Sequence, residues 1–282
     1  MTLKPFKSIG IGVAYSPNLK ANLFEAARLS IFFNSKLFLI HVGDASEDKI
    51  DMLKAILKSF EKDKLDYEVV FKKGDPVDVI LSVSEEKKID LLVLGAVQRE
   101  RFVKYYVGSI ARKITRQAKC SILLLIKPSV DRVACEHIVV NGLKAPKTEQ
   151  TITTSFYVAK QLKAKKITIV EEINQEQVAV KVNDDKSLRR ASIIKERIKL
   201  RENSRVKEII EHIPETYTND IIIKSQPIFG KKGYSIGHYA QISRADLLVM
   251  NAPSKMTFWD RLFPHDIEHI LTELPTDVLI LQ

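Results

Sequence analysis

The chain alternates short apolar runs with amphipathic segments, and this alternation predicts its secondary structure. Continuous apolar runs predict buried strands at residues 8–14, 36–42, 67–72, 91–94 and 121–126. Between them, apolar residues at helical spacing predict helices at 19–33, 50–60 and 77–87, and a further one that opens at Gly108-Ser109. Strands joined through helices usually lie parallel. We therefore expect an α/β fold in which a mostly parallel, doubly wound sheet carries helices on both faces.

This pattern occurs twice along the 282 residues. Ser8–Ala14 matches His137–Leu143 at an offset of 129 residues, and residues 40–42 match 169–171 at the same offset. Later segments match at an offset of 156, which places residues 89–94 on 245–250 and residues 122–125 on 278–281. Constant offsets in independent stretches indicate an internal repeat. We expect one five-stranded domain at residues 1–130, a linker that contains Pro128, and a second such domain at residues 136–282.

The two offsets differ by 27 residues, so the second repeat carries an insertion between its second and third strands, within residues 172–220. Its apolar residues keep a helical period, and we expect them to pack on the domain: Leu188, Ala191, Ile194, Ile198, Ile209 and Ile213. Asp184 and Asp185 suit a helix start, so we expect one long helix or two short ones over 184–213. The insertion is rich in Lys and Arg, which predicts either a solvated basic face or a docking surface for an acidic partner.

Residues 91–126 contain a glycine motif with the spacing Gly95-x2-Gln98-x9-Gly108-Ser109. This resembles the universal stress protein family, whose nucleotide-binding members carry Gly-x2-Gly-x9-Gly-Ser/Thr at this place. The resemblance implies a universal stress protein-like fold, of the adenine nucleotide alpha hydrolase-like type, and an ATP-type nucleotide site in the first repeat. It assigns the adenine side to Val42 and the phosphate side to Gly95, Gln98, Gly108 and Ser109.

Both repeats depart from the family pattern. In the first, Ala14 stands where the family has an aspartate that helps to hold the nucleotide, and Gln98 replaces a glycine. In the second, the motif positions become Asn251, Ser254, Pro264 and His265. Because Pro264 has no N–H donor, we expect nucleotide binding in the first repeat only. The alternative is a protein that has lost nucleotide binding and acts through its surfaces.

Composition narrows the class of protein further. Apolar residues make up 45% of the chain and charged residues 28%, so a buried core is expected. No apolar run reaches the roughly 18 residues of a membrane helix, and the N-terminus lacks the centre of a signal peptide. Two cysteines, Cys120 and Cys135, are too few for a disulfide framework. These features favour a cytoplasmic protein without a membrane partner. The net charge of +10 permits an anionic partner.

A metal centre is the competing interpretation for one segment. His265, Glu268 and His269 fit the H-x-x-E-H signature of zinc proteases. A catalytic zinc needs a third protein ligand and an open position, and the repeat leaves no protease scaffold around this segment. We therefore expect no metal. No catalytic base is identifiable either, so we expect a binding protein and not an enzyme.

The resemblance also implies an assembly and a role. In the family, the last strands of two domains pair across a dimer axis, which here predicts that residues 121–126 pair with residues 277–282 within one chain. Such an intramolecular pseudo-dimer leaves a higher homo-oligomer open. The expected role is a stress-response regulator with an unknown protein partner. Residues 181–207, the basic part of the insertion, contain no aromatic residue, which argues against nucleic acid.

Overall fold

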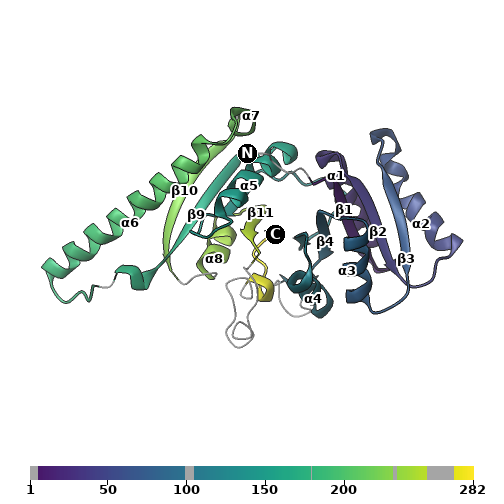
Figure 1. The fold of residues 1–282 in the computed structure, drawn as a ribbon, viewed down its shortest axis with the longest axis horizontal. Helices are drawn as coiled ribbons and strands as arrows, with labels where there is room; N and C mark the ends of the chain where they lie inside the picture. The colour runs from purple at the N-terminus through teal and green to yellow at the C-terminus, as the bar shows by residue number, and fades with distance from the viewer. Residues whose placement is uncertain (1–5, 99–104, 179, 231–233, 253–269) are drawn as a thin grey trace. The chain divides into compact units, whose positions relative to one another are not determined.

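The computed structural model describes residues 6–98, 105–178, 180–230, 234–252 and 270–282. It divides into two compact units, one formed by residues 1–134 together with 271–282 and the other by residues 135–270. Both units are built from the strands and helices drawn in Figure 1. Among the described residues, no helix is both long enough and apolar enough to cross a bilayer.

The first unit follows the predicted alternation closely. Its strands and helices, in chain order, are β1 (Ser8–Val13), α1 (Leu19–Phe33), β2 (Lys36–Val42), α2 (Glu47–Leu57), the 3-10 helix η1 (Lys58–Asp63), β3 (Tyr67–Lys72), α3 (Pro76–Glu86), β4 (Leu91–Gly95), β5 (Val97–Gln98), β6 (Tyr105–Tyr106), α4 (Ser109–Gln117), β7 (Ser121–Leu125) and β12 (Asp277–Leu281). The helix predicted at residues 50–60 begins earlier, because the Ser46 side chain accepts a hydrogen bond from the Lys49 amide and caps α2.

The main sheet of the first unit has the strand order β12-β7-β4-β1-β2-β3. All neighbours run parallel except β12, which pairs antiparallel with β7. Right-handed crossovers place α1 and α2 on one face and α3 and α4 on the other, and each of these two helix pairs packs together. Residues 91–94 of β4 and 122–125 of β7 are all apolar and buried, because both sheet faces are covered. From β1 the chain adds β2 and β3 on one side, and then β4 and β7 on the other, so the direction in which strands are added changes between β1 and β4.

The second unit repeats this plan with one long helix added. Its elements are β8 (His137–Asn141), α5 (Thr148–Leu162), β9 (Lys166–Asn174), the 3-10 helix η2 (Gln175–Val178), α6 (Asp185–Glu211), α7 (Glu215–Thr218), β10 (Ile222–Gly230), α8 (Tyr234–Ile242) and β11 (Leu247–Asn251). The strand order is β10-β9-β8-β11, all parallel. Helix α5 coincides with α1 at the offset of 129 residues.

Equivalent hydrogen bonds in the two units support the internal repeat. In the first unit, Asp90 Oδ2 accepts hydrogen bonds from the backbone amides of Lys7 and Ser8, at 2.9 and 3.1 Å. In the second, Asp246 Oδ2 accepts from Glu136 and His137, at 2.8 and 2.9 Å. Each aspartate thereby ties the start of the first strand to the start of the fourth.

The last strand of the chain lies with the first unit. Val278, Leu279 and Ile280 pair with Leu124, Leu123 and Ile122, which confirms the predicted pairing of residues 121–126 with 277–282. The Asp277 side chain also accepts a hydrogen bond from the Ile126 amide at 2.8 Å. By sequence offset this strand belongs to the second repeat, whereas by packing it belongs to the first unit. Pairing removes an exposed edge from β7.

The inserted segment forms one continuous helix, α6, of 27 residues between β9 and β10, as predicted. Asp184 caps it through a reciprocal hydrogen-bond pair with Ser187, which satisfies otherwise free amides of the first turn. Ala191 and Ile213 are buried, but the prediction that Leu188 packs on the domain is wrong, since 51% of it is exposed. Buried positions fall instead on Glu202 and Val206.

Candidate functional site

A cavity of about 1090 Å³ opens in the first unit at the carboxyl ends of its parallel strands. Its lining comes from the ends of β1, β2 and β4, from the first turns of α1 and α4, and from α3. The cavity lies where the strand order reverses between β1 and β4. In open α/β sheets this switch point is the usual place for a ligand, because the connections on its two sides diverge.

Four of the five predicted site residues line this cavity: Val42, Gly95, Gly108 and Ser109. They lie on three different elements, at the ends of β2 and β4 and at the start of α4. The fifth, Gln98, lies in β5, where it pairs with Tyr105 of β6. Residues far apart in the sequence therefore surround a single space, as the resemblance implies.

Two helix N-termini at the cavity lack a side-chain cap. Helix α4 begins after Gly108, and α1 begins after Asn18, and both cap residues line the cavity. No described side chain caps either helix, and neither has an acidic residue in its first turn. By contrast, Ser46 and Asp75 cap α2 and α3 with their side chains. Uncapped amides and the helix dipole together favour a negatively charged ligand group.

An aromatic wall closes one side of the cavity. The rings of Tyr15 and His41 meet edge to face with centroids 4.9 Å apart. His41 Nδ1 lies 3.0 Å from the Val13 carbonyl oxygen, and His41 Nε2 lies 3.3 Å from Lys49 Nζ. A carbonyl can only accept and an ammonium can only donate, so this geometry selects the neutral imidazole that carries its proton on Nδ1. The two rings give this side of the cavity aromatic surface on which a planar ring can pack.

Sequence reasoning missed Tyr15, His41 and Asn22 as cavity residues. The positions of Tyr15 and His41 at strand ends could have identified them, because the carboxyl ends of parallel strands surround such sites. Asn22 gave no signal, since it lies inside α1. Its Oδ1 atom is buried and has no hydrogen-bond partner among the described residues. A ligand that donates a hydrogen bond there would satisfy it.

The second unit has polar side chains at the positions that correspond to the cavity. Gly142 and Glu171 correspond to Val13 and Val42 at the offset of 129. Arg205 of α6 donates a hydrogen bond to the Gly142 carbonyl and pairs with Glu202 at 3.0 Å. The inserted helix thus places a guanidinium over the end of β8. Thr151 donates to Asn251 Oδ1 at 2.9 Å, and these two residues correspond to Asn22 and Gly95.

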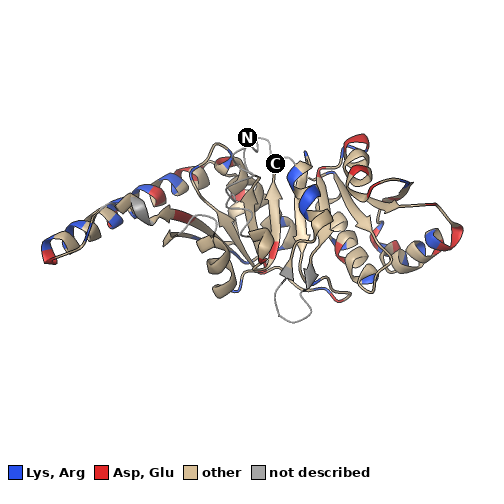
Figure 2. Cartoon of the chain, turned by 90° about the horizontal axis from the view of Figure 1, so that it is seen from below, with Lys and Arg blue, Asp and Glu red and all other residues tan. Residues whose placement is uncertain are grey.

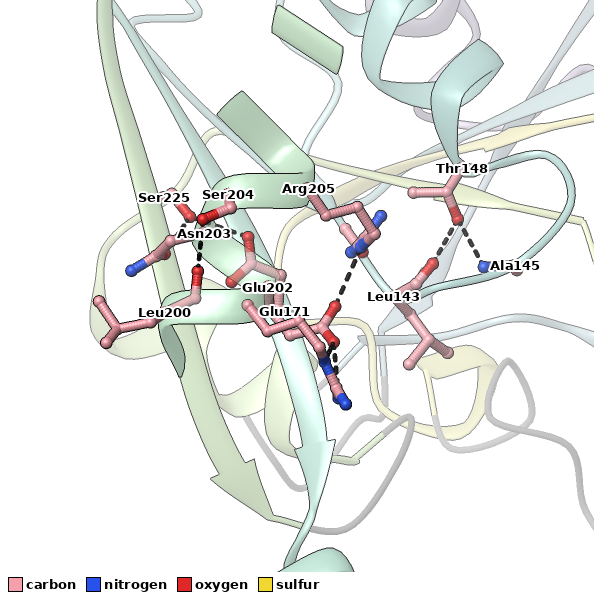
Figure 3. A network of polar contacts seen from close by, with 12 residues as sticks. Leu143, Ala145, Thr148, Glu171, Leu200, Glu202, Asn203, Ser204, Arg205 and Ser225 are labelled. Atoms are coloured by element: carbon pink, nitrogen blue, oxygen red, sulfur yellow. Dashed lines mark hydrogen bonds and ion pairs between the residues drawn. The ribbon is translucent and has the colours of Figure 1, made fainter. Parts of the chain in front are cut away.

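A buried polar network holds α6 in this position (Figure 3). Ser225 Oγ lies 2.8 Å from both Glu171 Oε1 and Asn203 Oδ1. The Ser225 hydroxyl donates to Glu171 Oε1, and its oxygen can accept from the Asn203 side-chain amide when the NH2 group of that amide faces it. Glu171 is only 2% exposed, and burial raises the pKa of its carboxyl. Burial also opposes ionisation of Glu202, but ion pairs with Arg205 and Arg201 hold the pKa of that carboxyl below its usual value.

Glu171→Gln is expected to stabilise the chain increasingly as pH rises. The raised pKa means that the folded state holds the Glu171 proton more tightly than the unfolded state. Its contribution to stability is therefore fully present below the ordinary pKa of 4.5 and is lost as pH rises through the folded pKa. Glutamine is neutral at every pH. Urea unfolding from about pH 4 to about pH 8 should show the two stability curves separating; parallel curves would contradict this account.

Several sequence predictions lie outside the described residues. These are the motif positions Ser254, Pro264 and His265 and the zinc-protease signature His265, Glu268 and His269. Arg99, Arg101 and Lys104, basic residues that follow Gln98, also lie outside. Within the described ranges, no group of three or more His, Cys, Asp or Glu side chains could hold a metal ion. Among the described residues, neither Cys120 nor Cys135 forms a disulfide.

The fold is thus doubly wound α/β with a cavity at its switch point, and comparison with known proteins shows what the chain is similar to. Residues 43–125 match the family model described as the universal stress protein family. A universal stress protein from Methanothermobacter thermautotrophicus is 32% identical over 65 residues, which cover 23% of this chain and 44% of that protein. One from Methanocaldococcus jannaschii is 28% identical over 123 residues, covering 37% and 72%.

Solved structures show the same fold over the full chain. A universal stress protein from Archaeoglobus fulgidus is 16% identical, with a TM-score of 0.67 over 99% of both chains. A Pseudomonas aeruginosa protein described as functionally unknown is 15% identical, with a TM-score of 0.70 over 98% of this chain and 92% of that one. The predicted fold class is confirmed, and so is the resemblance to the universal stress protein family, whose model matches residues 43–125. The chain spans 44% of the length of the first relative above, so activity and partners do not transfer from it.

Proposed function

We propose that this chain is a stress-response regulatory protein of the cytoplasm whose first unit binds one ATP-type nucleotide. The observation that carries this proposal is the cavity at the switch point, where Val42, Gly95, Gly108 and Ser109 come together. In this arrangement the adenine lies on the Val42 side, against the wall of Tyr15 and His41. The phosphates lie toward Gly95, Gln98 and the uncapped start of α4, where backbone amides neutralise their charge.

We propose binding and not hydrolysis. The residues that line the cavity include no Asp, Glu, Lys or Arg side chain in the described part of the chain. Hydrolysis of a phosphoanhydride uses a group that orients or deprotonates water and a cation that neutralises the developing charge. The lining includes the imidazole of His41, and both of its nitrogens already have partners. A bound nucleotide would therefore persist and act as a signal.

The direct test is native mass spectrometry of the full chain purified from its producing cells without denaturation. We expect a mass increment equal to one nucleotide per chain, lost on unfolding and identified by its fragments. Protein that carries no nucleotide, and that takes none up from added ATP, would favour the alternative of a surface-acting protein without a ligand.

Ala14→Asp is expected to tighten ATP binding about 10-fold or more. Ala14 lines the cavity at the position where the family has an aspartate, and it is exposed, so a carboxylate fits without strain. A charged acceptor for ribose hydroxyls contributes about 1.5–3 kcal/mol. The matched control is Leu143→Asp, the corresponding position of the second unit, which should leave affinity unchanged. Fluorescence titration with a labelled ATP analogue measures both; equal affinities in all three proteins would argue against this ligand orientation.

A further inference from the structure

Helix α6 carries an exposed row of residues that faces away from its domain. Its inner side is buried through Ala191, Glu202 and Val206. The opposite side shows exposed residues at alternating steps of four and three, here called the outer seam: Lys186, Arg190, Ile193, Arg197, Leu200 and Ser204. Steps of four and three give the 3.5-residue period by which one helix packs against another. Lys and Arg residues extend along the length of α6 in Figure 2.

The outer seam combines aliphatic anchors with unpaired cations. Ile193 and Leu200, one heptad apart, are 54% and 58% exposed. Nearby basic residues on other sides of the helix are neutralised, since Arg201 pairs with Glu202 and Lys199 with Glu196. Arg190 and Arg197 form no ion pair with any described residue. Arginine is one of the residue types enriched among those that dominate protein interfaces.

We propose that the outer seam of α6 docks an acidic amphipathic helix of a partner protein. Leucines of that helix would pack on Ile193 and Leu200, and its Glu or Asp side chains would meet Arg190 and Arg197. Two aliphatic side chains give little apolar area, so electrostatic complementarity would supply specificity and speed of association. The interaction is therefore expected to be micromolar and to weaken with salt. This proposal is independent of nucleotide binding.

Other occupants fit the seam less well. A membrane-surface helix inserts a contiguous apolar face, but the apolar face of α6 is already packed on the second unit. Nucleic acid lacks aliphatic groups to match Ile193 and Leu200, and α6 contains no aromatic residue on which a base could stack. A second copy of the seam would place Arg190 and Arg197 against like charges.

The test uses the full chain and a synthetic helical peptide of about four heptads. The peptide carries Leu at alternate positions of the face that would pack on the outer seam, and Glu at the positions that flank each Leu. A matched peptide carries Gln in place of every Glu. We expect fluorescence anisotropy to detect binding of the Glu peptide, weakened at least about tenfold by raising salt from 0.05 to about 0.5 M. The Gln peptide should bind at least about tenfold more weakly.

Two double variants probe the two halves of the interaction. Arg190→Gln/Arg197→Gln should lose at least about tenfold in affinity and most of the salt dependence. Ile193→Asn/Leu200→Asn should also lose affinity but keep its salt dependence. Lys58→Gln/Lys62→Gln removes the same charge from η1 in the first unit and is the control that should bind normally. All four substituted seam residues are exposed, so the melting temperature should stay unchanged.

Three results would overturn the proposal. The first is a Glu peptide that does not bind, or that binds all variants alike. The second is equal binding of the arginine variant and the η1 control, since net charge alone would then explain attraction. The third is evidence that the seam has another occupant. Binding of phosphatidylglycerol vesicles or of a DNA duplex that depends on the seam residues, without binding of the peptide, would be such evidence. Self-association in sedimentation velocity that depends on the seam residues would be such evidence too.

Discussion

Replacement of Gly108 by valine is expected to lower the ATP affinity of the first unit by about 10- to 100-fold. Gly108 is the cap residue of α4 and lines the cavity on its phosphate side. A branched side chain there keeps phosphate oxygens away from the first-turn amides, so charge-assisted hydrogen bonds are lost. Isothermal titration calorimetry on the full chain measures the change.

The backbone geometry makes this result interpretable. Gly108 has φ of −60° and ψ of 163°, a conformation that valine adopts without strain. The variant should therefore keep the melting temperature of the parent protein, and Gly108→Ala should lose less affinity because a methyl group is smaller. Unchanged affinity in the valine variant would place the phosphates elsewhere. A large fall in melting temperature would show that Gly108 serves the fold.

Arg205→Ala is expected to destabilise the second unit by about 2 to 4 kcal/mol. Arg205 is one of two arginines that pair with Glu202, which is 8% exposed, and it also donates to the Gly142 carbonyl. Removing the guanidinium leaves a buried carboxylate and a buried carbonyl without this partner. Thermal unfolding and hydrogen exchange of α6 amides should both report the loss.

Arg201→Ala is the matched control, because Arg201 also pairs with Glu202 but its side chain is 67% exposed. An exposed pair contributes about 0 to 1 kcal/mol. The double variant Glu202→Met/Arg205→Met should recover much of the stability, since apolar side chains of similar length need no partner. Equal effects of Arg201→Ala and Arg205→Ala would contradict the conclusion that Arg205 anchors the helix over β8.

The secondary structure could be predicted because local signals and tertiary packing agree along most of the chain. Helix α1 matches the predicted range of residues 19–33, and its repeat α5 matches at the same offset. The strands were predictable since both faces of a parallel sheet are covered, which leaves continuous apolar runs. The glycine motif and Val42 gave four cavity residues because strand ends of a parallel sheet converge on one edge.

Other features depend on long-range packing that periodicity does not reveal. Leu188 fits the helical period of α6 but lies beyond the domain surface, so it stays exposed. Glu202 and Arg205 are charged and would be predicted to face solvent, yet they neutralise each other and fill the space above β8. The cavity's Asn22 is likewise indistinguishable in sequence from a solvent-facing helical residue, because only the fold brings it close to Gly95.

The most direct test of the central claim is the stoichiometry of ATP binding to the full chain by isothermal titration calorimetry. The account predicts one site per chain, abolished or strongly weakened by Gly108→Val and unaffected by Arg205→Ala under conditions where that variant stays folded. Two sites per chain would contradict the expectation that only the first unit binds nucleotide. A titration that releases no heat, together with a labelled ATP analogue that unlabelled ATP does not displace, would contradict a nucleotide site in the first unit.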